Sequence, residues 1–278
     1  MKNFIKLFNF EINRFMKLYI SMLIVVFIIQ LSAVLLESFN YMSLVIDVTK
    51  GGRVSPEQFL QEYWSFSLAN ATYSLIFLAP IALSVVGLIF YMFFIWYRDW
   101  FARNTFIYRL LMLPANRMNI YFAKLATIMV TVIGMVAFQL IFIEIYKQVI
   151  KWIVPVVYRV DIPTGLIVDS TEYLNIVLPN NISDFFIAYG IGLTFVIVMF
   201  TAILFERSFK LLGSVIGLIY IGVAFGIFIA PFMIQFFFFN SMYFYPDEVF
   251  YIQTIITLVI IGVSLWVSHY LLTKKITV

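Results

Sequence analysis

Cysteine is absent from this 278-residue sequence, histidine occurs once, and charged residues make up only 12% of it. Without cysteine, the chain has no disulfide bond, no thiolate zinc site and no cysteine nucleophile. The single histidine, His269, excludes any site that needs a pair of histidines. A soluble domain is about 25% charged, so the scarcity of charge excludes a water-soluble protein.

Several catalytic motifs are also missing. No glycine-rich phosphate loop precedes a Lys-Ser or Lys-Thr pair, and no Gly-x-Ser-x-Gly nucleophile elbow occurs. We therefore expect that the chain is not an enzyme, binds no cofactor or metal of its own and has no nucleic-acid partner. Its apolar stretches contain only uncharged polar groups such as Gln30, Gln139 and Gln253, so we expect no buried ion pair and no proton- or sodium-driven pump.

Hydrophobic residues make up 64% of the chain, and they gather in long runs. A membrane-spanning helix needs about 20 mostly apolar residues, and backbone in lipid must satisfy its own hydrogen bonds. The runs predict an all-α membrane protein, with residues 1–278 as one transmembrane domain. Its six predicted spans are Leu18–Leu36, Ala71–Ile95, Leu125–Ile143, Phe185–Phe205, Leu211–Phe232 and Val249–Leu272.

The basic residues are distributed unequally between the two sides of these spans. Thirteen of the 18 lie on the side that holds both termini, against five on the other side. Because basic residues favour the cytoplasmic side, we expect both termini in the cytoplasm. The Phe-, Ile- and Asn-rich, Cys-free composition suggests a bacterial plasma membrane protein, with membrane lipid beside its basic face.

Two further segments are predicted to lie at the membrane surface. Residues 1–17 form an amphipathic interfacial helix, and Arg14 offers a partner for the one acidic residue near its apolar face. The segment Pro231–Pro246 is too apolar for an exposed loop and predicts a membrane-dipping element before the last span. The residues that characterise the amphipathic helix are Phe4, Phe8, Glu11, Ile12 and Phe15.

The fifth predicted span contains two pairs of glycines four residues apart. Small residues at this spacing let helices approach closely in a membrane. We expect these glycines at a helix interface. They are Gly213, Gly217, Gly222 and Gly226.

The connection between the second and third predicted spans, residues 97–124, is basic and amphipathic. Asn104 and Thr105 predict a helix start, and Pro114 ends that helix. By itself this pattern fits either an ordinary basic loop or a short helix held under the membrane.

This segment resembles the type-2 permease family of ABC transporters. That family has an acidic residue after the second span, a Gly/Asn-Thr step, a Leu-Leu-x-Leu-Pro run, and then Arg and Lys before the third span. The commoner residues at the first two places are Glu and Gly, which are Asp and Asn here. The matching residues are Asp99, Asn104, Thr105, Leu110, Leu111, Leu113, Pro114, Arg117 and Lys124.

The resemblance implies the transmembrane permease subunit of an ABC exporter, with a cytoplasmic coupling helix in this connection. A separate ATP-binding-cassette ATPase subunit would bind ATP and magnesium and dock there. A second permease subunit, identical or homologous, would complete the pathway, with the glycine pairs at the subunit interface. The residues implied in coupling are Asp99, Arg103, Asn104, Thr105, Arg109, Leu111, Pro114 and Arg117.

The charge-poor interior favours a hydrophobic or amphipathic cargo, for example a peptide. The alternative is a non-transporting membrane protein, such as a sensor or an assembly partner, which needs no ATPase. An ATP-binding-cassette reading frame beside this one distinguishes the two.

Overall fold

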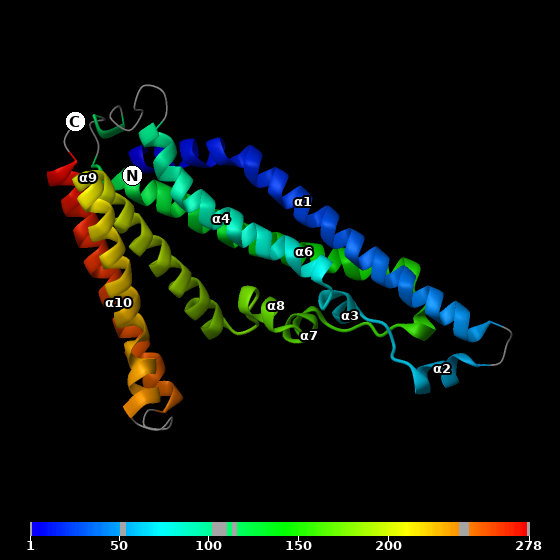
Figure 1. Cartoon of the computed structure of the whole chain (residues 1–278). Helices are drawn as coiled ribbons and strands as arrows, with labels where there is room; N and C mark the ends of the chain where they lie inside the picture. The colour runs from blue at the N-terminus through cyan, green and yellow to red at the C-terminus, as the bar shows by residue number, and fades with distance from the viewer. Residues whose placement is uncertain (1, 51–53, 102–109, 113–115, 239–244, 277–278) are drawn as a thin grey trace. The chain divides into compact units, whose positions relative to one another are not determined.

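The computed structural model describes residues 2–50, 54–101, 110–112, 116–238 and 245–276, with no β-strand among them. Five helices in this part of the chain are long and apolar enough to cross a membrane. The described residues therefore form an all-α protein with the helices of a multi-pass membrane protein, as predicted. These helices are α1 (Lys2–Thr49), α4 (Leu75–Phe101), α6 (Met118–Ile153), α9 (Ile182–Phe238) and α10 (Pro246–Tyr270) (Figure 1).

Short helices connect the long ones. Between α1 and α4 lie α2 (Pro56–Glu62) and α3 (Leu68–Thr72), and between α6 and α9 lie η1 (Val156–Tyr158), α7 (Thr164–Asp169) and α8 (Glu172–Val177). The π-helix η2 (Leu271–Lys275) follows α10.

The chain folds as two compact units. Unit 1 comprises Met1–Glu11, Phe90–Met129 and Tyr189–Val278, and unit 2 comprises Ile12–Ile89 and Val130–Ala188. The helices α1, α4 and α6 run from one unit into the other, so each unit contains a part of all three.

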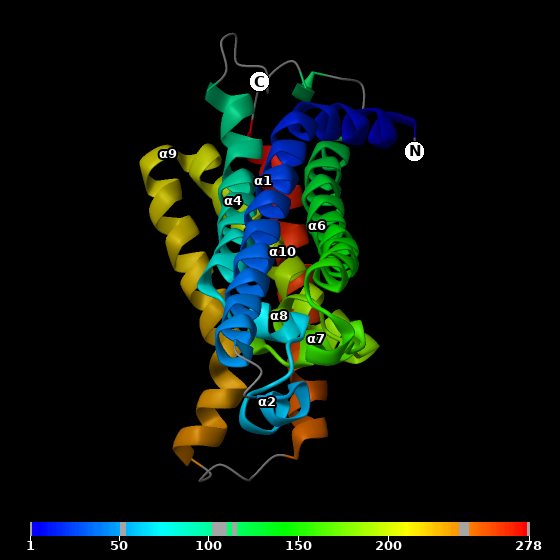
Figure 2. The ribbon, with the colours of Figure 1, turned by 90° about the vertical axis from the view of Figure 1, so that its right-hand side faces the viewer.

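In unit 2, the parts of α1, α4 and α6 lie side by side around an apolar core (Figure 1). Val34, Phe77 and Tyr146, one from each helix, are fully buried. The short helices add Phe59 and Ile167 to the same core. Figure 2 shows α2, α7 and α8 gathered at one end of this bundle.

Two long helices extend beyond the predicted spans. The first span was predicted to end at Leu36 and the third at Ile143, but α1 continues to Thr49 and α6 to Ile153. The reason is a buried face that persists at helical spacing. On α1 this face carries Tyr41 and Val45, and on α6 it carries Tyr146 and Ile150.

At the N-terminus, α1 begins at Lys2 and runs without interruption through the predicted interfacial helix into the first predicted span. The predicted apolar face is the less exposed face of this segment. Phe4 and Phe8 are partly buried and their rings stack 6.1 Å apart. Ile12 is partly buried, and Glu11 and Phe15 are each only 2% exposed.

The fourth and fifth predicted spans both belong to α9, which reverses direction at Lys210. Lys210 has a φ of 54° and a ψ of −130°, far from helical values. Beyond this turn, a Cβ at Gly217 would lie 2.9 Å from the Ala202 carbonyl oxygen, and one at Gly213 would collide with the Phe205 carbonyl. The two segments of α9 are thus antiparallel, and the glycines allow their backbones to touch.

The segment that was predicted to dip into the membrane is only partly described. Residues Pro231–Phe238 continue α9, and α10 begins at Pro246. The rest of that prediction falls on residues 239–244, which lie outside the described residues.

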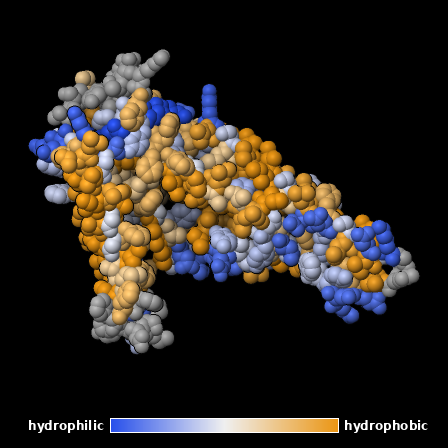
Figure 3. Space-filling model, in the orientation of Figure 1, coloured by the Kyte–Doolittle hydropathy of each residue, from blue (hydrophilic) through white to orange (hydrophobic). Residues whose placement is uncertain are grey.

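The long helices have mostly hydrophobic surfaces, as Figure 3 shows. Leu218 on α9 and Trp266 on α10 are 73% and 71% exposed. Apolar surface on this scale marks contact with lipid or with other protein.

Candidate functional site

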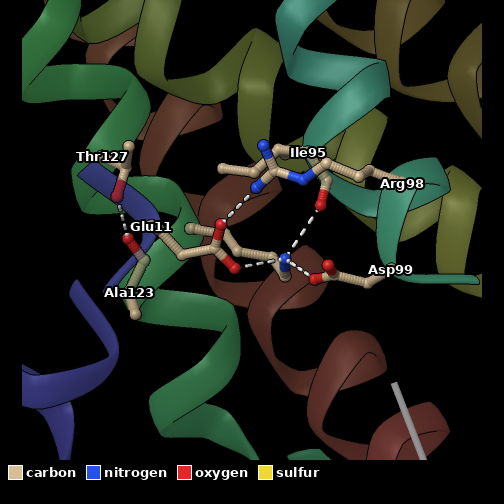
Figure 4. Close-up of polar contacts among 7 residues, drawn as sticks. Glu11, Ile95, Arg98, Asp99, Ala123 and Thr127 are labelled. Carbon is tan, nitrogen blue, oxygen red and sulfur yellow. Dashed lines mark hydrogen bonds and ion pairs between the residues drawn. The ribbon is translucent and has the colours of Figure 1, made fainter. Parts of the chain in front are cut away.

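Four charged side chains meet within unit 1 and form what we call the charge network. Glu11 comes from the beginning of α1, Arg98 and Asp99 from the end of α4, and Lys124 from α6 (Figure 4). Arg98 Nη2 and Lys124 Nζ each lie 2.7 Å from a different oxygen of Glu11. Lys124 Nζ also donates to Asp99 Oδ2 and, at 2.8 Å, to the Ile95 carbonyl oxygen.

The charge network is nearly closed to solvent. The side chains of Lys124 and Asp99 are fully buried, and those of Glu11 and Arg98 are 3% and 15% exposed. A lysine ammonium has three donors, and Glu11, Asp99 and Ile95 accept all three. Two carboxylates face two cations, so the formal charges balance. This balance matters, because removing one partner of a buried ion pair costs about 3–5 kcal/mol.

The expectation of no buried ion pair is therefore wrong. In the sequence, each of these charges stands at the end of an apolar run, where a side chain usually reaches water. The helices α1, α4 and α6 converge at that level, and their convergence buries the charges. The absence of a buried ion pair therefore no longer counts against an ion-driven pump.

Aromatic side chains surround the network. Trp96, one turn before Asp99 on α4, is fully buried, and its ring lies 5.3 Å from Lys124 Nζ. Trp96 packs edge-to-face on Phe200 of α9, with ring centroids 5.4 Å apart. Such packing keeps water out, and in a dry environment a broken ion pair is most costly. The helical spacing of the α4 residues sets up this arrangement, because Met92, Ile95, Trp96 and Asp99 share one buried face.

The end of α4 is also attached to α9. The guanidinium of Arg207, three residues before the turn of α9, lies over the rings of Tyr97 and Phe101 at 4.8 and 4.6 Å. The Tyr97 hydroxyl donates to Glu206 Oε2. The last turn of α4 is thus held on two sides, by the charge network and by α9.

A further attachment lies just before α6. Arg117 Nη1 donates to the carbonyl oxygens of Leu272 and Ile276, at 2.6 and 2.7 Å. These carbonyls lie at the end of η2, where the last carbonyl groups of a helix have no partner within the helix. Arg117 therefore ties the start of α6 to the C-terminal end of the chain.

The residues implied in coupling fall into three groups. Asp99 and Arg117 lie at the two attachments described above. Leu111 and its neighbour Leu110 are helical and 6% exposed, as expected for the apolar side of a short helix. The remaining five lie outside the described residues, and they are Arg103, Asn104, Thr105, Arg109 and Pro114.

The four glycines divide into two pairs. Gly213 and Gly217 are buried within the chain, against the first segment of α9. Gly222 and Gly226 are exposed, and no other heavy atom lies within 4 Å of where their Cβ would be. A contact with a second subunit stays a prediction, and Gly222 and Gly226 are the pair with room for one.

Sequence reasoning identified Asp99 and Glu11 as notable but missed their partners. Arg14 was offered as a partner for Glu11, and the structure adds Arg98 and Lys124, which are 87 and 113 residues away in sequence. The available signal was the position of Glu11 on the apolar face of its helix, since a carboxylate there needs a cation from another element.

Comparison with known proteins returned no match: no family model, no curated protein and no solved structure is similar to this chain. The resemblance to the type-2 permeases rests on the residues of the 97–124 connection and on the order of elements. The resemblance stays a prediction.

Proposed function

We propose that the chain is the transmembrane permease subunit of an ATP-binding-cassette exporter. It moves a hydrophobic or amphipathic substrate out of the cell with ATP that a separate subunit hydrolyses. One observation carries this proposal: both ends of the segment 102–117 are tied to several helices of unit 1. Arg98 and Asp99 precede the segment, Arg117 ends it, and Lys124 follows it within α6.

These attachments would transmit a displacement of the segment, caused by a docked ATPase, to several helices of unit 1. A displacement at its beginning reaches α1 through the Arg98–Glu11 pair and α9 through the Tyr97–Glu206 hydrogen bond. A displacement at its far end reaches the C-terminal end through Arg117. Packed and hydrogen-bonded elements of this kind shift between discrete arrangements rather than deforming continuously. An ATPase that docks on the segment would therefore move several helices together.

In this proposal Asp99 has a structural role inside the protein and does not contact the ATPase. Its side chain is fully buried against Lys124. We propose that Asp99 holds the beginning of the coupling segment in place. Docking is assigned to the basic residues within the segment, such as Arg103 and Arg109. The partner ATPase carries the ATP and magnesium, and this chain needs no cofactor.

Six membrane crossings fit the helices when α9 is counted twice. Each of its antiparallel segments exceeds the roughly 20 residues that one crossing needs. Both termini then lie on the side with most of the basic residues, the cytoplasmic face of a bacterial plasma membrane. A second permease subunit completes the pathway, and the exposed Gly222 and Gly226 offer it a surface for close approach.

The competing proposal is a non-transporting sensor or assembly partner. Its support is that a balanced, buried charge network also serves a static membrane protein. It differs in needing no ATPase, so the experiment that separates the two is a search for that partner.

The test is affinity purification of the full-length tagged chain from its native membrane, followed by identification of bound proteins. We expect an ATP-binding-cassette ATPase in near-equal amount. Arg109→Glu should release it, because the substitution reverses a charge in the docking segment. Lys50→Glu is the matched control, since Lys50 is 70% exposed on the predicted external side and its reversal should leave the ATPase bound.

Two results would contradict the proposal. Absence of any ATPase from the purified wild-type chain favours the sensor or assembly role. Equal retention of the ATPase by Arg109→Glu and Lys50→Glu removes the docking assignment.

A further inference from the structure

The two segments of α9 and Ile260 of α10 line a partly open apolar cavity of about 190 Å³ within unit 1. Its lining includes Phe195 and Val198 from the first segment of α9, Ala224 and Phe225 from the second, and Ile260 from α10. A cavity of about 150 Å³ lined by aliphatic groups is large enough to bind benzene. This cavity therefore has room for a short length of hydrocarbon.

The cavity follows from how the α9 segments pack. Near the turn, Gly217 brings the segments into backbone contact at Ala202. Farther from the turn, the facing residues are Val198 and Ala224, which pack with Ile260 as a small cluster. Ala224 has too short a side chain to fill the space that opens there.

The lining determines which ligand fits. Among the residues that line the cavity, Thr194 alone has a polar side chain, and its hydroxyl already donates to the Gly190 carbonyl oxygen at 2.8 Å. A peptide would bring backbone amides that find no partner here, at a cost of several kcal/mol for each. A hydrocarbon chain brings none. The chemistry therefore selects an acyl chain over a peptide segment.

A basic cluster lies at the turn end of the same unit. Lys210, Lys274 and Lys275 are exposed, and Lys275 Nζ lies 5.6 Å from the ring of Phe209, next to Lys210. Leu211, directly after the turn, is 87% exposed. A basic cluster with a protruding apolar side chain is complementary to an anionic headgroup above hydrocarbon.

The spacing of the cluster and the cavity matches a lipid. Ile221, which lines the cavity, lies eleven positions after Lys210. At 1.5 Å per residue this is about 17 Å, close to half of the roughly 30 Å hydrocarbon thickness of a bilayer. An acyl chain whose headgroup sits at the lysines thus reaches the cavity within one leaflet.

We propose that the α9–α10 part of unit 1 is a binding site for one anionic phospholipid. The phosphate binds at Lys210 and Lys275, and the end of one acyl chain fills the cavity beside Ala224. This site does not depend on the exporter proposal, because it needs neither the ATPase nor the coupling segment.

Native mass spectrometry of the full-length chain in detergent tests the proposal, with phosphatidylglycerol and phosphatidylcholine of equal 16–18-carbon chains as probes. We expect phosphatidylglycerol to bind at least about fivefold more tightly, since one lysine near a headgroup contributes about that factor. Lys210→Gln with Lys275→Gln should reduce the preference to below about twofold. Lys17→Gln, an exposed lysine outside the cluster, should leave it unchanged.

The cavity is tested separately. Ala224→Phe fills it and should weaken binding of both long-chain lipids about tenfold while their ratio is kept, since several methylene contacts are lost. Val223→Phe, one residue away and 53% exposed, should bind as the wild type does. Wild-type chain with six-carbon phosphatidylglycerol provides a test that needs no variant, and it should also bind about tenfold more weakly.

Equal binding of the two headgroups by the wild type would overturn the lysine assignment. Equal affinity of the long- and six-carbon lipids, or of Ala224→Phe and Val223→Phe, would overturn the cavity as an acyl site.

Discussion

The helices α1, α4 and α6 are joined in both units, but by different chemistry. In unit 1 the charge network joins them through buried ion pairs. In unit 2 uncharged groups do so, where Gln30 of α1 donates to the Phe77 carbonyl oxygen of α4 at 3.3 Å and accepts from the Tyr146 hydroxyl of α6 at 3.3 Å. The same three helices are thus connected by buried ion pairs in one unit and by neutral hydrogen bonds in the other, and we expect the ion pairs to be the more sensitive to loss of a partner.

This difference follows from the cost of an unpaired group. A neutral hydrogen-bonding group left unsatisfied in the interior costs about 1–3 kcal/mol, whereas a buried charge without its partner costs more. The charge network also lies at the ends of the predicted coupling segment. Unit 2 provides a core in which Phe77 and Tyr146 are fully buried, together with neutral hydrogen bonds. We infer that substitutions of the charged residues in unit 1 destabilise the protein strongly, whereas unit 2 tolerates substitution of its neutral hydrogen-bonding residues better.

The largest effect is expected at Lys124. Lys124→Met keeps the length of the side chain and removes its charge, which leaves Asp99 and Glu11 facing each other without the ammonium that both bind. We expect a loss of about 3–5 kcal/mol in the free energy of unfolding, measured by denaturant titration of the purified chain in mixed micelles. Lys124→Met with Asp99→Asn restores the balance of charge around the Glu11–Arg98 pair and should regain at least half of that loss. A double variant no more stable than the single one would show that charge balance is not what holds this join.

A smaller effect is expected at the uncharged join inside unit 1, the turn of α9. Gly213→Ala places a Cβ against the Phe205 carbonyl and Glu206 Cα, and overpacking of this kind costs about 1–3 kcal/mol. Gly222→Ala is the matched control, because no heavy atom lies within 4 Å of its Cβ position, and it should leave the unfolding free energy unchanged or raise it slightly. The same titration compares them. If Gly222→Ala instead changes the oligomeric state on gel filtration, this glycine contacts a second subunit.

The smallest effect is expected in unit 2. Gln30→Leu removes the amide that bridges α4 and α6, but the single hydrogen of the Tyr146 hydroxyl then goes wholly to the Phe27 carbonyl oxygen, 3.2 Å away. We expect a loss of about 1–2 kcal/mol, well below that of Lys124→Met in the same experiment. A loss as large as that of Lys124→Met would remove the distinction between the two units.

The sequence predicted the helices well and their contacts poorly. Long apolar runs identify helices because each run has one physical explanation in a membrane. Their limits were less clear, since Tyr41 and Tyr146 continue a buried face beyond the apolar runs. The antiparallel fold of α9 was anticipated as two spans, whereas the role of Gly213 in that fold needed the backbone positions.

The charge network was beyond sequence reasoning for a related reason. Periodicity along one helix locates the face of Glu11, but it does not say which helix lies opposite. Arg98 looked like an ordinary basic residue at the edge of a span, and Lys124 was noted only for its place in the permease-like segment. Only the meeting of three helices makes them partners of one carboxylate.

The most direct test of the account is a double-mutant cycle on Glu11 and Lys124. The free energy of unfolding is measured for the wild type, Glu11→Gln, Lys124→Met and the double variant. Groups in one network show coupling of about 0.5–3 kcal/mol, whereas independent sites add to within about 0.5 kcal/mol. We expect a coupling near the upper end, about 2 kcal/mol or more. Additive effects of the two substitutions would contradict the claim that this buried ion pair joins α1 to α6.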